Sequence, residues 1–276
     1  MRNKIFTKDQ IKDSLLKVVF FCLFFLGLFF TFSPWIKEAL IKQEVARYSL
    51  GNFTATEIKS NRNNLLPSEE GLTVTDPDFS TVLTKISKVS REDVVGAIII
   101  NDLNMLLPII KGTNTQNLLV GATTVNNEQE MGNGNYVLAG HHMRDKSLLF
   151  GPLLQIKTGT LIQLTDKEFI YSYEVTNTKL VHENDISVLE DTEDPVITLI
   201  TCNVSGVNTV NRVIVIGQFI DKSNVEDDNP YVTKYKESMG ANEEVSIICQ
   251  YIFLGWIIGI GLLTFLIMRG LMLLRL

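Results

Sequence analysis

The sequence of 276 residues contains only three cysteines and three histidines, and these shortages exclude several classes of protein. Cys22 and Cys249 lie inside long uncharged hydrophobic runs, so Cys202 is the only cysteine outside them. A framework of internal disulfides is therefore excluded for the part of the chain between the two runs. The cysteines and histidines also lack the spacing of a zinc site, and the sequence contains no glycine-rich phosphate loop.

Basic residues are also too few and too scattered to indicate a nucleic-acid-binding protein. The chain has 25 lysines and arginines against 31 aspartates and glutamates, which gives a formal net charge of −6. The two terminal tails carry +3 and +2, so the part between the hydrophobic runs carries −11. Such an acidic surface repels nucleic acids and other polyanions. We therefore predict no nucleic-acid partner.

The two hydrophobic runs, residues 18–36 and 245–268, have the length of membrane-spanning helices. At about 1.5 Å of rise per residue, each is long enough to cross a bilayer core of about 30 Å. The first run has no Ala-x-Ala-like cleavage motif before Ser33, which favours an uncleaved anchor over a signal peptide. Lysine and arginine exceed acidic residues in the tails 1–17 and 269–276, as is typical of the cytoplasmic side. We therefore expect a cell-membrane protein with two spans, both termini cytoplasmic and residues 37–244 extracellular.

The extracellular part divides into three segments. Residues 37–85 mix helix formers with a polar stretch and are interpreted as a stalk with a short helix near its end. We expect that helix to begin with Asp76 as its cap and Pro77 at its first position. Residues 86–222 are long enough for one domain, and residues 223–244 form a polar return linker.

Residues 86–222 are predicted to form an all-β domain. Short runs rich in valine, isoleucine, tyrosine and threonine alternate with turn residues, as is typical of strands joined by tight turns. The predicted strands are 96–101, 106–110, 136–140, 161–165, 169–175, 196–202 and 213–220. Several short strands at this spacing favour a closed or nearly closed barrel.

Cys202 is the first candidate for chemistry, because it ends the predicted strand 196–202. A single thiol at the end of a rigid strand indicates a nucleophile, although a small buried apolar residue is an equally good interpretation of a lone cysteine. A nucleophilic thiol needs a partner that takes its proton. His141 and the adjacent His142 end another predicted strand, whereas His182 begins an acidic loop and is expected to be solvated.

Arg212 opens the last predicted strand and is a second candidate. A permanently charged guanidinium among apolar neighbours needs an anionic partner, such as an oxyanion or a carboxylate. The alternative interpretation is a surface charge at a strand end.

Three motifs with these residues occur in a characteristic order: Tyr136-Val-Leu-Ala-Gly-His-His142, Thr198-Leu-Ile-Thr-Cys202 and Arg212-Val-Ile-Val-Ile-Gly217. Together they resemble the sortase family, the membrane-bound cysteine transpeptidases of Gram-positive bacteria, to which Thr-Leu-x-Thr-Cys is specific. The resemblance covers about residues 73–222 and is closest to class A, the housekeeping type. It implies a closed sortase-type β-barrel with short helices, tethered here by N- and C-terminal transmembrane helices.

The resemblance also implies the roles of three residues. Cys202 would attack the threonine carbonyl of a Leu-Pro-x-Thr-Gly-like sorting signal. His141 would protonate the departing glycine amine and later deprotonate the incoming amine. Arg212 would bind the substrate and stabilise the oxyanion.

Three further residues match positions near the cleft of the family. Thr201 would add to oxyanion stabilisation, although threonine at that position is also a good strand former. Ala139 and Ile200 match positions in the wall of the peptide groove. His142 matches a position that varies in related motifs and is interpreted as a neighbour.

The partners implied by the resemblance are secreted proteins with an LPxTG-like sorting signal and an amine of lipid II or peptidoglycan. The amine would resolve a thioester on Cys202 and so anchor a surface protein to the cell wall. We predict no cofactor and no metal. Some class A members use calcium near this cleft, and two acidic loops of this chain offer carboxylates for it: Glu128, Glu130, Glu190, Asp191, Glu193 and Asp194.

Two alternatives belong to other functional classes. The C-terminal hydrophobic run is more typical of class C sortases, which polymerise pilins, and Thr75-Asp-Pro-Asp-Phe79 faintly resembles the lid that some of them carry. We favour a helix start for that segment. The other alternative is a non-catalytic, membrane-tethered binding domain, against which the joint presence of Cys202, His141 and Arg212 argues.

Overall fold

The structure is a computed structural model that describes residues 8–64, 77–126, 128–204, 209–227, 230–233 and 235–236. Within this part, three α-helices precede the strands: α1 (Lys8–Arg47), α2 (Ala55–Asn63) and α3 (Phe79–Lys85). The strands are β1 (Val94–Ile100), β2 (Met105–Ile110), β3 (Ala122–Thr124), β4 (Asn135–Ala139), β5 (Leu161–Thr165), β6 (Phe169–His182), β7 (Val196–Cys202) and β8 (Asn211–Asn224).

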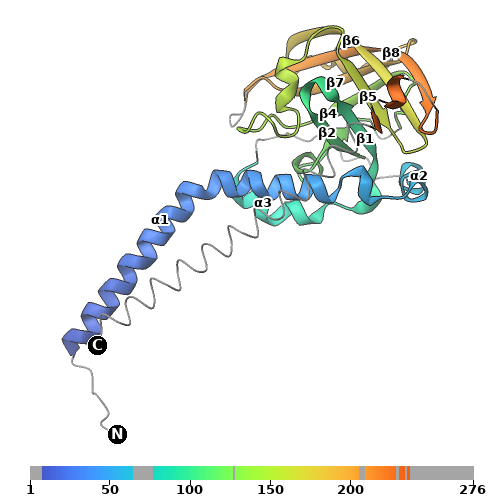
Figure 1. Cartoon of the computed structure of the whole chain (residues 1–276). Helices are drawn as coiled ribbons and strands as arrows, with labels where there is room; N and C mark the ends of the chain where they lie inside the picture. The colour runs from blue at the N-terminus through green and yellow to red at the C-terminus, as the bar shows by residue number, and fades with distance from the viewer. Residues whose placement is uncertain are drawn as a thin grey trace.

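The strands form one closed barrel in the order β1-β2-β3-β4-β7-β8-β6-β5, with β5 pairing back to β1 (Figure 1). The pairs β2/β3 and β4/β7 are parallel, and the other neighbours are antiparallel. Each of these eight strands has a partner on both sides, and closure of this kind is the main way in which small all-β domains avoid edge-to-edge association. The predicted closed all-β barrel is confirmed.

The barrel is filled by the apolar strand residues that the sequence pattern selects. All seven residues of β1 are buried, because this strand faces the barrel interior on one side and the helices on the other. Gly96 lies in the middle of β1, where a Cβ atom would collide with the carbonyl oxygen of Thr165 on β5. Tyr173 is fully buried and its hydroxyl accepts a hydrogen bond of 2.8 Å from the backbone N–H of Gly132.

Residues 37–85, which we expected to form a stalk, contribute α2 and α3, and both lie beside the barrel (Figure 1). The helix α2 begins with a capping box, in which Thr54 and Glu57 exchange hydrogen bonds. Its Asn61 side chain is buried and donates to the carbonyl oxygens of Arg91 and Val94, both at 2.8 Å. This amide therefore fixes α2 to the start of β1.

The predicted short helix is present as α3, but its cap lies two residues later than expected. The carboxylate of Asp78 accepts a hydrogen bond of 2.6 Å from the backbone N–H of Thr81, so Asp78 is the N-cap. The sequence has two aspartates around Pro77, and the second has the correct spacing to its N3 amide. Asp76 lies outside the described residues.

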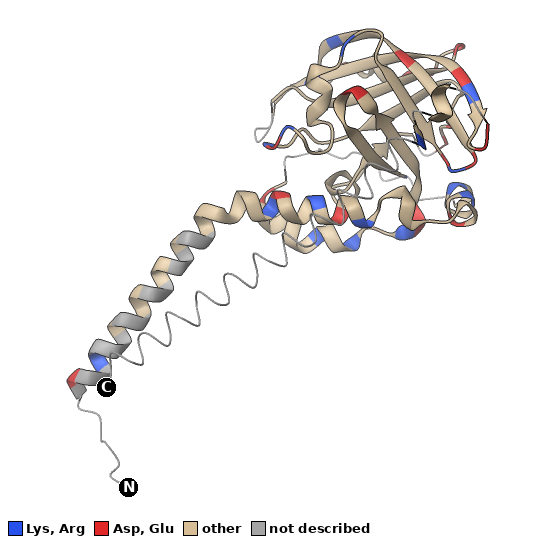
Figure 2. Cartoon of the chain, in the orientation of Figure 1, with Lys and Arg blue, Asp and Glu red and all other residues tan. Residues whose placement is uncertain are grey.

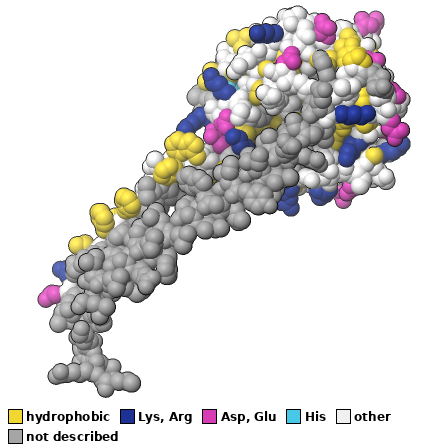
Figure 3. All heavy atoms as spheres, in the orientation of Figure 1, with side chains coloured by type: hydrophobic (Ala, Val, Ile, Leu, Met, Phe, Trp, Pro, Cys, Tyr) yellow, Lys and Arg dark blue, Asp and Glu magenta, His cyan; other side chains and the backbone are white. Residues whose placement is uncertain are grey.

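The hydrophobic run 18–36 lies within α1, which extends away from the barrel (Figure 1). Large apolar side chains are exposed along this helix, among them Phe20, Leu23, Phe30 and Trp35 (Figure 3). In the part of the chain that the structure describes, no helix combines the length and apolarity required to cross a membrane. The second run, 245–268, lies outside the described residues.

Candidate active site

The three residues predicted to be catalytic lie at the ends of three neighbouring strands. In the parallel pair β4/β7, Ala139 is opposite Ile200, and the backbone N–H of Gly140 donates to the carbonyl oxygen of Ile200 at 3.0 Å. His141 and Cys202 each follow these partners by two residues, so the strand register brings them to the same end of the barrel. In the antiparallel pair β7/β8, Cys202 is directly opposite Arg212.

The backbone around His141 is held by Phe150. The N–H of Phe150 donates to the carbonyl oxygen of His141 at 3.0 Å. The fully buried ring of Phe150 lies against Gly140, where a Cβ atom would come within 2.6 Å of the ring. Glycine is therefore required immediately before His141, because any side chain would push the ring and the histidine apart.

The side chain of His141 is only 3% exposed, and its Nε2 atom has no hydrogen-bond partner among the described residues. Burial lowers the pKa of His141 to about 4, and the positive charge of Lys37 contributes in the same direction. The imidazole is therefore neutral at pH 7 and able to accept a proton.

The second half of α1 lies over the loop that follows His141. The ammonium group of Lys42 pairs with the carboxylate of Asp145 at 2.9 Å, and the carboxylate of Glu38 accepts from the backbone N–H of Asp145 at 3.1 Å. Trp35 also lies on this helix, and the guanidinium of Arg144 stacks over its ring at 5.2 Å. These contacts keep α1 close to the histidine and explain why Lys37 affects its pKa.

His142, which we interpreted as a neighbour, contacts Cys202 through the backbone. Its Nδ1 atom lies 3.1 Å from the carbonyl oxygen of Cys202, and the residue is buried. A bridge to Leu149 fixes its own backbone. The second histidine of the pair therefore ties the loop after β4 to the end of β7, a role that the sequence pattern did not indicate.

Cys202 carries a reduced thiol and is half-buried at the end of β7. Thr201, beside it, is buried, and its hydroxyl donates to the carbonyl oxygen of Gly140 at 2.8 Å. This hydrogen bond thus links the end of β7 to the backbone immediately before His141. Ala139 and Ile200 are half-buried and adjacent in the strand register. The roles of these three neighbours in oxyanion and substrate binding remain predictions.

Arg212 has the anionic partner that its position requires. Its Nη2 atom lies 2.7 Å from a carboxylate oxygen of Glu183, and its Nη1 atom donates to the carbonyl oxygens of Asn211, at 3.2 Å, and of Thr209. The side chain of Arg212 is 19% exposed and that of Glu183 41%. The sequence indicates an anionic partner for Arg212 but not which residue supplies it. That residue is Glu183, which directly follows the end of β6.

The acidic loops show no metal-binding arrangement within the described residues, where no three or more histidine, cysteine or acidic side chains converge. Asp191 instead organises its own loop, since its carboxylate accepts from the backbone N–H groups of Asn135 and Thr192 at 2.9 and 3.0 Å. His182 is exposed, as its position in an acidic loop predicted.

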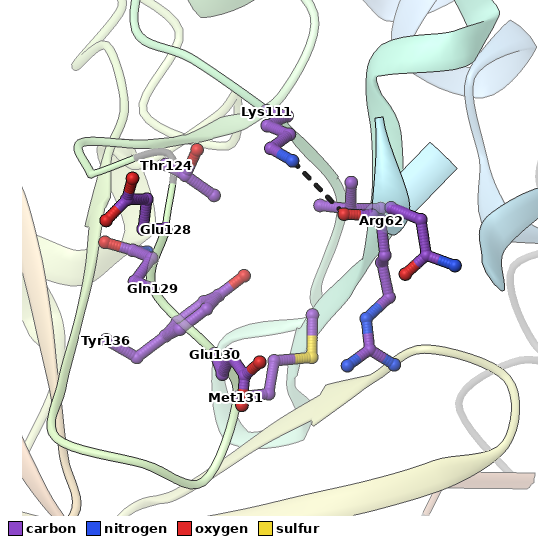
Figure 4. Close-up of a pocket in the computed structure, with 10 residues that line it drawn as sticks. Arg62, Lys111, Thr124, Glu128, Gln129, Glu130, Met131 and Tyr136 are labelled. Carbon is purple, nitrogen blue, oxygen red and sulfur yellow. Dashed lines mark hydrogen bonds between the residues drawn. The ribbon is translucent and has the colours of Figure 1, made fainter. Parts of the chain in front are cut away.

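A polar cavity of about 200 Å³ lies elsewhere, between α2, the barrel and the loop before β4 (Figure 4). The hydroxyl of Tyr136 points into it, and Lys111 closes one side by donating to the carbonyl oxygen of Arg62 at 3.2 Å. None of the three predicted catalytic residues lines this cavity. Both basic and acidic residues occur along the described ribbon of the barrel (Figure 2).

The chain is similar to known proteins in both sequence and structure. Residues 98–220 match the model of the sortase domain family. The chain is 39% identical to Sortase A of Listeria monocytogenes over 217 residues, which cover 78% of this chain and 97% of that protein. It is 38% identical to Sortase A of Bacillus anthracis over 147 residues, 53% of this chain and 69% of that protein.

Among solved structures, the crystal structure of L. monocytogenes sortase A aligns with a TM-score of 0.48 and 46% identity, covering 51% of this chain and 97% of that one. The near-complete coverage of the L. monocytogenes sequence, at an identity well above 30%, decides the family assignment. The chain belongs to the sortase family of transpeptidases.

Proposed function

We propose that this protein is a membrane-anchored cysteine transpeptidase that cleaves an LPxTG-like sorting signal between threonine and glycine and joins the acyl group to a cell-wall amine. The observation that carries the proposal is the convergence of Cys202, His141 and Arg212 at the ends of β7, β4 and β8. A thiol, a buried imidazole and a guanidinium are together the groups that acyl transfer through a thioester needs.

In the first half of the reaction, the sulfur of Cys202 attacks the threonine carbonyl carbon and the thiol proton passes to the imidazole of His141. Arg212 stabilises the negative charge on the carbonyl oxygen of the tetrahedral intermediate. Collapse of the intermediate breaks the bond to the glycine nitrogen, which leaves with the proton from His141. The products are a thioester on Cys202 and a free glycine amine.

In the second half, an amine attacks the thioester carbonyl while the imidazole of His141 accepts its proton. The thiolate of Cys202 leaves and is protonated again. His141 is neutral at pH 7 and so carries no proton until the thiol or the amine supplies one, and its burial limits access of water to the imidazole. Ala139 and Ile200 are proposed to contact the peptide, because they are half-buried apolar residues at the same strand ends.

Anchoring to the membrane is proposed from the sequence and from α1. The run 18–36 is uncharged, and the apolar side chains exposed along α1 would be covered by lipid (Figure 3). In the same proposal residues 245–268 form a second span, and both termini are cytoplasmic. The barrel then meets secreted proteins and lipid II outside the cell.

The test uses the full chain in detergent with a fluorescent Leu-Pro-x-Thr-Gly peptide and triglycine, followed by mass spectrometry. We expect a product cut after threonine and joined to triglycine, and an acyl-enzyme mass on Cys202. The Cys202→Ala variant removes both, while Lys88→Gln, which changes an exposed side chain in the turn before β1, retains both.

A second acceptor separates cell-wall anchoring from pilin polymerisation. A peptide with a single lysine side-chain amine replaces triglycine, and its N-terminus is blocked. Preference for the lysine peptide would favour the pilin-polymerising alternative. Absence of both products and of an acyl-enzyme, for a panel of signal variants, would contradict the transpeptidase and favour a binding domain.

A further inference from the structure

Glu183 follows the last residue of β6 and is the acidic side chain that contacts Arg212. It is fixed by two independent contacts. Its backbone N–H donates to the carbonyl oxygen of Val210 at 2.7 Å, which continues the β6/β8 ladder beyond the pair His182/Asn211. Its carboxylate lies 2.7 Å from Nη2 of Arg212. The backbone contact survives any substitution except proline, so the carboxylate can be tested without loosening the strand.

The guanidinium of Arg212 is held from two sides. Glu183 binds Nη2, while the carbonyl oxygens of Thr209 and Asn211 accept from Nη1. A guanidinium has five N–H donors in a rigid plane. Among the described residues, these three contacts leave two of the donors, one on Nη2 and the one on Nε, for another acceptor. Because the plane is rigid, an anchor on one edge fixes the direction of the donors on the other.

We propose that Glu183 is a positioning residue for the transpeptidation reaction, holding the guanidinium of Arg212 so that its remaining donors are directed at the acyl group on Cys202. This inference rests on the proposed function and deepens it. Cys202 and Arg212 are opposite each other in the β7/β8 ladder, so strand pairing already brings the arginine next to the cysteine. What the contact with Glu183 adds is a fixed direction for the remaining N–H donors. Glu183 touches neither the thiol nor the reacting carbonyl in this scheme and acts through Arg212.

The positioning role predicts a specific kinetic pattern. In Glu183→Ala we expect kcat to fall about tenfold with KM nearly unchanged, because an oxyanion forms only in the transition state. Glu183→Gln keeps a carbonyl oxygen as acceptor, and its loss should be about threefold. Glu174→Gln is the matched control, since it removes an exposed carboxylate from the same strand β6 away from Arg212.

A double-mutant cycle separates positioning from a general structural effect. In the Arg212→Ala background, Glu183→Ala should change kcat by less than about twofold, because no guanidinium remains to be positioned. The same fold loss in both backgrounds would overturn the proposal. A rise in kcat/KM in Glu183→Ala would also overturn it, because Glu183 would then withhold Arg212 from the substrate.

A readout without substrate makes the test independent of the proposed function. Phenylglyoxal modifies accessible guanidinium groups, and peptide mass spectrometry follows Arg212 in the full chain. We expect faster modification of Arg212 in Glu183→Gln, with an unchanged rate at Arg62, whose guanidinium pairs with buried Asp166. An unchanged rate at Arg212 would overturn the proposal.

A wild-type chain that fails to join the peptide to triglycine would contradict the proposed function and, with it, the positioning role of Glu183. The modification rates would still decide whether Glu183 and Arg212 form an ion pair.

Discussion

Cys202 and Arg212 are opposite each other at the end of the β7/β8 ladder, where β7 finishes with the thiol and β8 begins with the guanidinium. Neighbouring antiparallel strands are separated by about 5 Å, so the spacing of the two residues is set by backbone hydrogen bonds rather than by a flexible loop. The ladder therefore fixes the backbone of the two residues, while Thr209 in the joining loop and Glu183 hold the guanidinium itself.

Replacing Arg212 tests what its guanidinium contributes. We expect Arg212→Ala to lower kcat for transpeptidation by about 10² to 10³, the usual effect of losing an oxyanion donor. Arg212→Lys keeps the charge but loses the planar fork, so its kcat should fall between those of the wild type and Arg212→Ala. Steady-state kinetics measure both, and thermal unfolding verifies the fold. Full activity in Arg212→Lys would show that only the charge matters.

The rate of transpeptidation should depend on pH through a bell-shaped curve. If Cys202 and His141 hold opposite protonation states, the rate falls on the acid side of the lower pKa and on the basic side of the higher one. The positive charge of Lys37 lowers the pKa of His141, so Lys37→Gln should shift the acid limb of kcat/KM to higher pH. Lys88→Gln, an exposed lysine, is the control. A flat profile, or an identical acid limb in Lys37→Gln, would contradict this pairing.

The stability of the fold should also depend on His141. Its pKa is about 4 in the folded protein, against 6.5 for an ordinary histidine, so the unfolded chain binds the proton more readily between these values. The free energy of unfolding is therefore fully retained above about pH 6.5 and decreases as the pH falls toward 4. From pH 7.5 to 5 the expected decrease from this residue is about 2 kcal/mol.

Chemical denaturation of the full chain in detergent, followed by circular dichroism, measures this decrease. Other groups titrate in the same range, so the informative quantity is the difference between wild type and His141→Gln. The variant should lose about 2 kcal/mol less over the same pH interval. Equal slopes for the two proteins would mean that His141 becomes protonated without unfolding.

Gly140→Ala should destabilise the barrel at the end of β4, next to His141. The new Cβ atom would lie within 2.6 Å of the ring of Phe150, which is fully buried. We expect a loss of about 1–3 kcal/mol, the usual cost of overpacking a core. Gly51→Ala is the matched control, because a Cβ atom added there would meet no other described atom within 4 Å. Equal thermal midpoints for the two variants would contradict the close packing.

Turn residues predict strand bounds better than apolar content does, since β1 and β2 are apolar throughout and yet begin earlier than predicted. The predicted bounds of β5 and β7 agree with the structure, because turn residues stand at both ends of each run. The strand β3 was missed, since its three residues are too few to show any periodicity. The strands β6 and β8 are longer than predicted, because their pairing continues into polar residues that interrupt the apolar pattern: 177–182 of β6 pair with 211–216 of β8, and 221–224 of β8 pair with 169–172 of β6.

Sequence motifs predict the candidate site residues that lie within them, but not the residue that is brought to the site by strand pairing. Cys202 and Arg212 were identified from motifs in the chain. Glu183 lies 29 residues before Arg212 and is brought to it by the β6/β8 ladder, which no local pattern encodes. The capping box at Thr54 and Glu57 is a local pattern, and reading it would have predicted α2 within the expected stalk.

The closed circuit of hydrogen-bonded strands also constrains how an extended peptide is recognised. Proteins with an open sheet often bind such peptides by adding them as an extra strand, so that main-chain pairing supplies the affinity and pockets for alternate side chains supply the specificity. Here β1 pairs with β5, so the sheet closes, and in the described residues unpaired edges are limited to strand ends such as 177–182 of β6, which pair with β8 alone. Over the closed part of the barrel we therefore expect an extended peptide to be recognised through its side chains, at the loops and strand ends, rather than by main-chain pairing.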